Sequence, residues 1–147
     1  MIFRPASIND LPILNKISLQ SKKHWGYPDE WIAKWKPDMM VGENDLAEKS
    51  IIVAVADRVV VGFCAVMEKQ ENYEVMHLWL LPEFLGKGFG KQLLEAALKS
   101  IIKQPKPIIV ESDPNAETFY EKQGFVTFDK IESYPPGRYL PVMKKEI

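Results

Sequence analysis

The sequence predicts a mixed α/β fold, and three observations lead to this prediction. Apolar, β-branched runs of strand length alternate along the chain with stretches in which apolar residues recur at helical spacing. One glycine-rich segment, residues 86–90, joins a strand-like run directly to an amphipathic helix. With 147 residues, 46% of them hydrophobic, the chain is long enough to bury a substantial core. We therefore expect one domain over residues 1–147.

The N-terminal half predicts two helices followed by a hairpin. Ser7 and Asp10 have the spacing of a capping box, and Pro28 suits the first turn of a helix. Two β-branched runs flank Asp57 and Arg58, as expected of a hairpin whose strands lie inside a sheet. The elements expected here are an edge strand at 2–6, a helix to about 22, a helix from 28, a loop with a short turn at 37–48, and strands at 51–57 and 59–68.

The C-terminal half alternates strands and helices. Apolar residues after the glycines fall on one side of a helix that Pro105 ends, and Gly124 is a typical C-terminal cap. The elements expected here are a strand at 72–81, a helix from 89, a strand at 107–111, a helix at 115–123, and strands at 125–131 and 139–144. This order favours a layered mixed α/β sheet.

Charge and composition exclude several classes of function. Nineteen basic and twenty acidic residues leave a net charge of −1, which argues against binding to nucleic acid or to an anionic membrane surface. The longest apolar run, 59–67, is about half of the ~20 residues that a membrane span needs, and residues 1–5 lack a signal-peptide pattern. The only cysteine, Cys64, permits no internal disulfide. We expect a cytoplasmic protein without a metal site.

The glycine-rich segment predicts an anion cradle. Glycine lets the backbone turn sharply and present several N–H groups, and the start of the following helix adds positive potential. Two familiar phosphate motifs do not fit. A dinucleotide-binding fingerprint on Gly86 and Gly88 needs a glycine where Lys91 stands, and a Walker loop needs Ser or Thr where Gln92 follows Gly90 and Lys91. A different nucleotide-like ligand is indicated.

Two segments resemble the GNAT superfamily of acetyl-coenzyme A-dependent N-acetyltransferases. The first is similar to the family's Gln/Arg-x-x-Gly-x-Gly/Ala loop, with Gly88 and Gly90 at the glycine positions and Leu85 in place of Gln/Arg. The second, residues 113–125, resembles Asn-x-x-Ala-x-x-x-Tyr-x-x-x-Gly-Phe, with Asp113 in place of the Asn and Asn115 as its candidate substitute. The resemblance implies a central, mostly antiparallel, splayed sheet with flanking helices.

The resemblance also implies a cosubstrate and a reaction. Acetyl-coenzyme A would bind along the glycine segment, and a primary amine of a small molecule or peptide would attack the acetyl group directly. A backbone N–H near Leu80 would polarise the acetyl carbonyl. The residues expected to bind the coenzyme are Leu80, Leu81, Leu85, Gly86, Lys87, Gly88, Phe89, Gly90, Lys91, Asp113, Asn115 and Tyr120.

Two residues are candidates for proton transfer. Tyr120 matches the family tyrosine that protonates the coenzyme A thiolate, and Glu74 matches the strand position from which some members remove the amine proton. Glu74 is equally well explained as a solvated carboxylate. Strand alternation puts His77 on the opposite face from Glu74, where we expect a hydrogen-bonded core histidine. His24 and Tyr27 fall where the family's acceptor pocket is lined.

A second class of function stays open at this point. The substitutions at Leu85 and Asp113 are also compatible with a non-catalytic acyl-coenzyme A sensor that keeps the cradle without the chemistry. The acceptor is not identifiable from the sequence. The oligomeric state is open as well, with a homodimer as one option.

Overall fold

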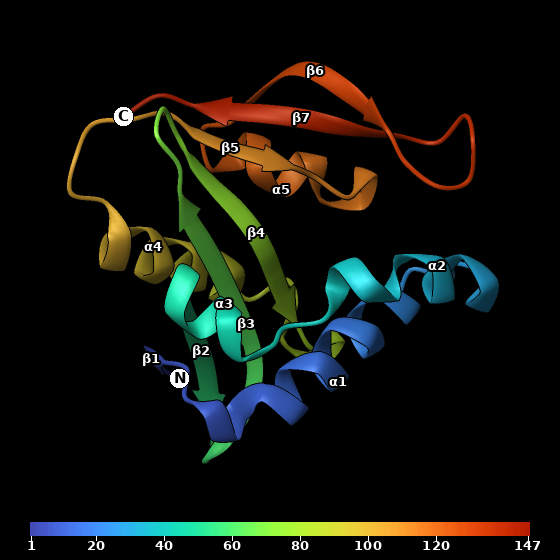
Figure 1. Ribbon diagram of the computed structural model, residues 1–147. Coiled ribbons are helices and arrows are strands. Elements are labelled where there is room, and N and C mark those ends of the chain that lie inside the picture. The colour runs from blue at the N-terminus through green and yellow to red at the C-terminus, as the bar shows by residue number, and fades with distance from the viewer.

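The computed structural model describes residues 1–147 as one seven-stranded sheet with helices on both faces (Figure 1). The strand order in the sheet is β1-β2-β3-β4-β5-β7-β6. The strands are β1 (Ile2–Pro5), β2 (Ser50–Ala56), β3 (Val59–Glu68), β4 (Tyr73–Leu80), β5 (Ile108–Glu111), β6 (Val126–Glu132) and β7 (Tyr139–Lys145). The helices are α1 (Leu11–Lys23), α2 (Asp29–Met39), α3 (Glu43–Glu48), α4 (Phe89–Ile101) and α5 (Glu117–Lys122). Short 3-10 turns precede α1, α4 and α5.

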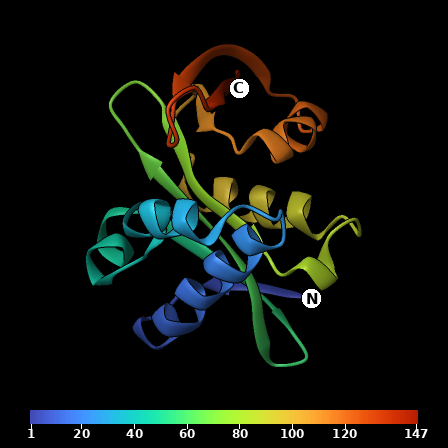
Figure 2. The same ribbon diagram turned by 90° about the vertical axis from the view of Figure 1, so that its right-hand side faces the viewer.

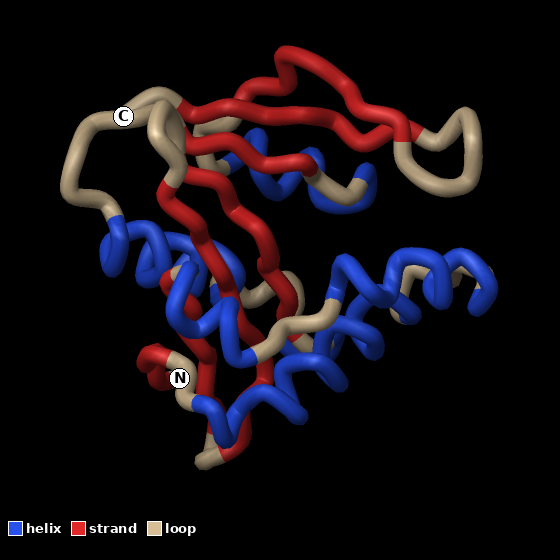
Figure 3. The backbone as a smooth tube through the Cα atoms, in the orientation of Figure 1, coloured by secondary structure: helices blue, strands red, loops and turns tan.

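The sheet opens between its two central strands. Five of the six strand pairs are antiparallel, and only β4 and β5 run parallel. Their pairing covers Tyr73 to Val75 against Ile108 to Val110, after which the two strands diverge (Figures 1 and 3). The prediction of a mostly antiparallel, splayed sheet with flanking helices is confirmed. From Met76 onward, no ladder of backbone hydrogen bonds holds β4 to β5.

Different helices cover the two faces of the sheet (Figure 2). On one face, the apolar side of α4 and the aromatic residues of α5 share a core with both halves of the sheet, including Leu94, Tyr120 and Val75. On the other face, α1 and the segment after α2 pack on β2 and β3, with Leu14 and Phe63 fully buried. The apolar core therefore joins the two halves of the sheet only on the α4 and α5 face.

Residues 37–48 differ from the expected loop. The helix α2 continues through Pro37 to Met39, and a separate helix, α3, follows. The buried side chains of Trp35 and Met39 explain the continuation, because packing outweighs the disruption that a proline causes in a last helical turn. The carboxylate of Asp45 caps the N-terminus of α3, because it accepts a hydrogen bond of 2.7 Å from the backbone N–H of Gly42.

A bulge in β4 corrects the predicted alternation of its side chains. Ala65 of β3 pairs with His77, whereas Val66 pairs with Val75, so Met76 is the extra residue. Val75 and Leu80 consequently share the α4 face, while His77 stacks on Phe63 of the opposite core. The prediction that His77 and Glu74 point to opposite faces is wrong, because one additional residue between them restores them to the same side.

Gly62 explains how closely β3 approaches the end of β4. A Cβ atom at this position would lie 2.7 Å from the carbonyl oxygen of Trp79 and 2.7 Å from a methyl carbon of Leu80. Contacts this short do not occur between real side chains and backbone, so a larger residue would push β4 away from β3.

None of the five helices is both long enough and apolar enough to cross a membrane.

Candidate functional site

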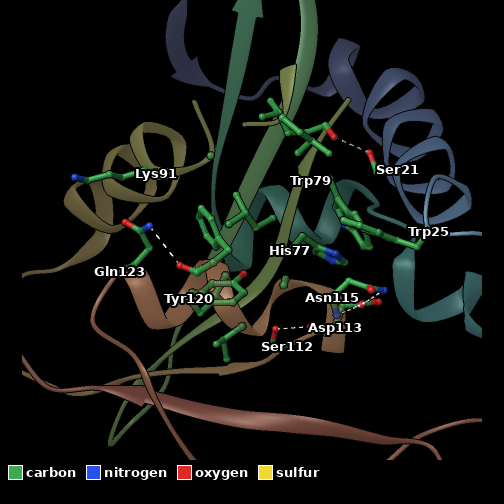
Figure 4. A pocket seen from close by; sticks show the side chains of 18 of the residues that line it. Ser21, Trp25, His77, Trp79, Lys91, Ser112, Asp113, Asn115, Tyr120 and Gln123 are labelled. Atoms are coloured by element: carbon green, nitrogen blue, oxygen red, sulfur yellow. Dashed lines mark hydrogen bonds between the residues drawn. The ribbon is translucent and has the colours of Figure 1, made fainter. Parts of the chain in front are cut away.

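A cavity of about 510 Å³ follows the opening between β4 and β5 (Figure 4). Figure 4 shows Lys91 and Gln123 at one end, Trp25 and Trp79 at the other, and Tyr120 between them. The lining comes from the glycine segment, the divergent parts of β4 and β5, α5 and the end of α1. One continuous space therefore connects the predicted phosphate cradle to His24, one of the two predicted acceptor residues.

The glycine segment has the backbone conformation that a cradle needs. Gly86 and Gly88 have φ angles of +73° and +84°, in the left-handed region that favours glycine, and a Cβ at either position would meet only open space. Gly90 serves packing instead, because a Cβ there would approach the Phe119 ring to 3.2 Å. The 13-residue helix α4 starts at Phe89, so its N-terminal amides face the same region.

The predicted coenzyme-binding residues divide into two groups. Those that line the cavity are Leu80, Leu85, Gly86, Gly88, Gly90, Lys91, Asp113, Asn115 and Tyr120, whereas Leu81, Lys87 and Phe89 do not. The N–H of Leu81 is bonded to Val61 of β3 at 2.8 Å, and the Phe89 ring packs near Phe84. These three residues flank the cavity without forming its wall.

The backbone of Leu80 faces the opening. Its carbonyl oxygen accepts a hydrogen bond of 3.2 Å from the Ser21 hydroxyl of α1, outside the β3 ladder. The N–H and C=O of one strand residue point to the same side, so the Leu80 N–H also points away from β3. The Leu80 N–H is thus directed toward the side of β4 on which the cavity lies.

Tyr120 of α5 lies at the centre of the cavity wall. Its side chain is only 5% exposed, and its ring packs edge-to-face against Phe119 and Phe125. The hydroxyl makes no hydrogen bond within the protein and is not among the fully enclosed polar atoms, so it faces the cavity. Burial raises the pKa of this phenol well above its usual range, which keeps the hydroxyl protonated.

Two carboxylates stand where β4 and β5 begin to diverge. Glu74 forms an ion pair with Lys69 and does not line the cavity, whereas Glu111 at the end of β5 does. Burial and the neighbouring charge of Glu74 raise the pKa of the Glu111 carboxyl. Glu111 was not predicted from the sequence, since a carboxylate at a strand end carries no distinguishing local pattern.

His77 and Trp79 form the wall of the cavity next to α1 and α2. The His77 ring makes no hydrogen bond within the protein, so the prediction of a hydrogen-bonded core histidine is wrong. Burial lowers the pKa of His77 to about 4, which keeps the ring neutral at physiological pH. The indole N–H of Trp79 is buried without a partner.

A polar cluster closes the end of the cavity near α1. The Asp113 carboxylate lies 2.5 Å from the Lys22 ammonium and 3.6 Å from the Arg138 guanidinium. It also accepts hydrogen bonds from the Tyr27 hydroxyl at 3.1 Å and from the Asn115 backbone at 2.8 Å. We call these five residues the Asp113 cluster. Neither Lys22 nor Arg138 was predicted, because residues so distant in sequence give no local signal of their contact.

Burial and charge act against each other in this cluster. Burial alone would raise the pKa of Asp113, but Lys22 and the hydrogen bonds from Asn115 and Tyr27 together outweigh it and hold the pKa below its usual range. Burial also lowers the pKa of the Lys22 ammonium, with Asp113 partly opposing the shift. Among the predicted acceptor residues, His24 lines the cavity, whereas Tyr27 lies behind it within the cluster.

Comparison with known proteins agrees with this fold. The family model described as the acetyltransferase (GNAT) domain matches residues 15–146, which is most of the chain. The chain therefore belongs to the GNAT acetyltransferase domain family. A curated relative, an uncharacterized N-acetyltransferase of Archaeoglobus fulgidus, is 30% identical over 84 residues, covering 50% of this chain. The match spans 57% of that relative's length.

Solved structures show the same arrangement of elements. The PaiA N-acetyltransferase of Thermoplasma acidophilum, crystallised with coenzyme A, is 25% identical and superposes with a TM-score of 0.79, over 99% of this chain and 98% of its own. The N-acetylglutamate synthase of Neisseria gonorrhoeae, with coenzyme A and N-acetylglutamate, has a TM-score of 0.71 at 18% identity, over 99% of this chain and 34% of its own. The latter likeness concerns the fold alone.

Proposed function

We propose that the chain is an N-acetyltransferase that transfers acetyl from acetyl-coenzyme A to a primary amine of a small molecule or peptide. The observation that carries the proposal is the continuity of the cavity. It begins at an open glycine cradle, passes the outward-facing N–H of Leu80 and the Tyr120 hydroxyl, and ends at His24 and Trp25. A long carrier with a phosphate end and a reactive acyl end fits such a space, and an amine can approach from the other end.

The cradle suits a diphosphate for two reasons. The left-handed Gly86 and Gly88 leave the space in front of their amides free of side chains, and the start of α4 adds a favourable dipole. Lys91 contributes a positive charge to the same end of the cavity. Leu85 supplies no polar group where other members have Gln or Arg, so the backbone would carry most of the grip. Asn115 would contact the carrier farther along the cavity, whereas the Asp113 carboxylate is engaged by neighbours within the protein.

The chain's own groups account for each step of the transfer. The Leu80 N–H would polarise the acetyl carbonyl as the amine nitrogen forms its bond to the carbonyl carbon. The carbon–sulfur bond then breaks, and the Tyr120 hydroxyl gives its proton to the leaving thiolate. The proton lost by the amine would pass to a carboxylate, directly or through water. Glu74 is our candidate for this role, and Glu111, which lines the cavity beside it, could relay the proton.

The proposal is tested by the appearance of free thiol from acetyl-coenzyme A. Polyamines, amino acids, aminoglycosides and lysine peptides are offered in turn, and mass spectrometry identifies the acetylated product. We expect turnover above the rate of hydrolysis with at least one amine class. Calorimetry that detected no binding of acetyl-coenzyme A would refute the proposal at its first step.

The two departures from the family motifs favour one alternative, a non-catalytic acyl-coenzyme A sensor. Leu85 removes a polar contact from the loop, and the Asp113 carboxylate is engaged by neighbours within the protein. A sensor would be stabilised against heat by acetyl-coenzyme A and would release no thiol with any amine. The intact Tyr120, facing the cavity without a partner, is the reason for ranking the enzyme first.

A further inference from the structure

The Asp113 cluster joins segments that are far apart in sequence and lie on opposite sides of the cavity. Lys22 lies in the last turn of α1 and Tyr27 follows that helix, and both belong to the side formed by β4 and its covering helices. Asp113 and Asn115 follow β5, and Arg138 comes from the loop between β6 and β7. Every ion pair and hydrogen bond between these two sets therefore spans the opening of the sheet.

Little else on this face of the sheet fixes the width of the opening. The backbone pairing of β4 with β5 ends at Val75 and Val110, and the shared apolar core lies on the opposite face. A further link is the hydrogen bond of 3.0 Å from the Trp35 indole to the carbonyl oxygen of Tyr134. The Arg138 guanidinium also stacks on the Trp35 ring, 4.4 Å from its centre.

We propose that Asp113 is a positioning residue whose ion pairs with Lys22 and Arg138 hold the opening at the width that the reaction needs. This inference rests on the proposed acetyl transfer. The Leu80 N–H belongs to the α1 side, because Ser21 of α1 bonds its carbonyl. Tyr120 belongs to the β5 side, through α5. Leu80 and Tyr120 also share the apolar core on the α4 face. The cluster thus acts from the α1 side on the distance between the group that would polarise the acetyl carbonyl and the group that would protonate the thiolate.

The chemistry of the cluster explains why this chain has Asp where the family motif has Asn. An asparagine has no charge to compensate Lys22, which is 8% exposed, or the nearby Arg138. Two cations would then face each other in a poorly hydrated place, and removing one partner of such a group leaves an uncompensated buried charge. The carboxylate is therefore required by the two cations.

The first test compares Asp113→Asn with Asp38→Asn, which removes the same charge from an exposed position on α2 without an ion pair. Misplacing reacting groups by about 1 Å costs up to about 100-fold in rate, so we expect kcat of Asp113→Asn to fall by about 10- to 100-fold. The KM for acetyl-coenzyme A should change less than about threefold, because the glycine cradle is untouched. Asp38→Asn should match the wild type. An unchanged kcat would overturn the positioning role.

A double variant tests the mechanism of the effect. Lys22→Met in the Asp113→Asn background removes the unpaired buried ammonium, so kcat should recover by at least about threefold over Asp113→Asn alone. Strictly additive losses would contradict the inference. A residue that served only general stability would lower the unfolding temperature and the coenzyme affinity together, without this recovery.

A distance measurement separates this inference from the proposed function. Cys64 is fully buried, so spin labels attach selectively to cysteines introduced at the exposed positions Lys36 on α2 and Val126 on β6. In Asp113→Asn the distance distribution between the labels should broaden and its mean should lengthen, without any substrate present. A distribution equal to that of Asp38→Asn would overturn the inference, whereas absent wild-type turnover would count only against the proposed function.

Discussion

Replacing Tyr120 with Phe separates chemistry from stability. The side chain is 5% exposed and its hydroxyl has no hydrogen-bond partner in the protein, so Phe keeps the packing against Phe119 and Phe125. The free energy of unfolding should change by less than about 1 kcal/mol, since no intramolecular hydrogen bond is lost. A general acid contributes about 10²- to 10⁴-fold to the rate, so kcat should fall by that factor.

The assay follows thiol release at saturating acetyl-coenzyme A, together with urea unfolding of the same preparations. Tyr139→Phe is the matched control, because Tyr139 is 44% exposed on β7 and does not line the cavity. Coenzyme affinity, measured by calorimetry, should stay within about twofold in both variants, since the phenol acts on the leaving thiolate rather than in binding. A Tyr120→Phe protein with wild-type kcat would remove this residue from the mechanism and with it the strongest argument against a sensor.

The pH dependence of the wild type gives a related check. Burial raises the pKa of Tyr120, so the phenol stays protonated through the pH range in which a free tyrosine ionises. Stability from this buried neutral form is complete below the ordinary phenol pKa of about 10 and is lost as the pH rises toward the higher folded-state value. We therefore expect no loss of kcat from this group below about pH 10. A kcat that declined below about pH 10 because Tyr120 ionises there would contradict the conclusion that burial raises the pKa of Tyr120.

Three further predictions concern other parts of the site. Gly88→Ala should lower the free energy of unfolding in urea by about 1–2 kcal/mol because of its left-handed φ of +84°, and it should weaken coenzyme binding in calorimetry. Gly42→Ala, at a negative φ in open space, should change neither quantity, and equal effects of the two substitutions would argue against the cradle. Glu74→Gln should move the pH–rate profile toward higher pH if Glu74 takes the amine proton. A shift of the acid limb of that profile toward lower pH would instead identify Glu111 as the base, because the substitution removes the negative charge that raises the pKa of Glu111. The wild type should lose folding stability as the pH falls from about 6.5 toward 4, because the folded-state pKa of His77 is lowered to about 4. The stability of His77→Gln relative to the wild type should therefore be higher at pH 4–6 than at pH 7, and parallel pH–stability curves for the two proteins would refute this.

Features set by local patterns were predictable from the sequence. The hairpin around Asp57 and Arg58 and the apolar stripe of α4 were both predicted, because neighbouring residues determine a tight turn and a helical face. Several of the predicted coenzyme-binding residues, including Gly86, Gly88 and Tyr120, line one cavity. Motifs of fixed spacing carry this information because the loop and the helix that contain them form locally.

Features set by pairing between distant segments were not predictable. The bulge at Met76 depends on the register of β4 against β3, and it reverses the face that strand alternation gives to His77. The continuation of α2 past Pro37 depends on the packing of Met39. Of the ion-pair partners of Asp113, Lys22 lies 91 residues earlier in the chain and Arg138 lies in a later loop. A substituted motif residue such as Asp113 signals a departure without naming its new partner.

The burial of Cys64 has a practical and chemical consequence. The thiol is 0% exposed, so oxidants in solution do not reach it, and burial raises its pKa, so it stays protonated. Peroxide and alkylating agents should leave the folded chain's cysteine unmodified, since both react with an accessible thiolate. In a colorimetric sulfhydryl assay, the native protein then adds no background, and each equivalent of colour reports a molecule of coenzyme A released.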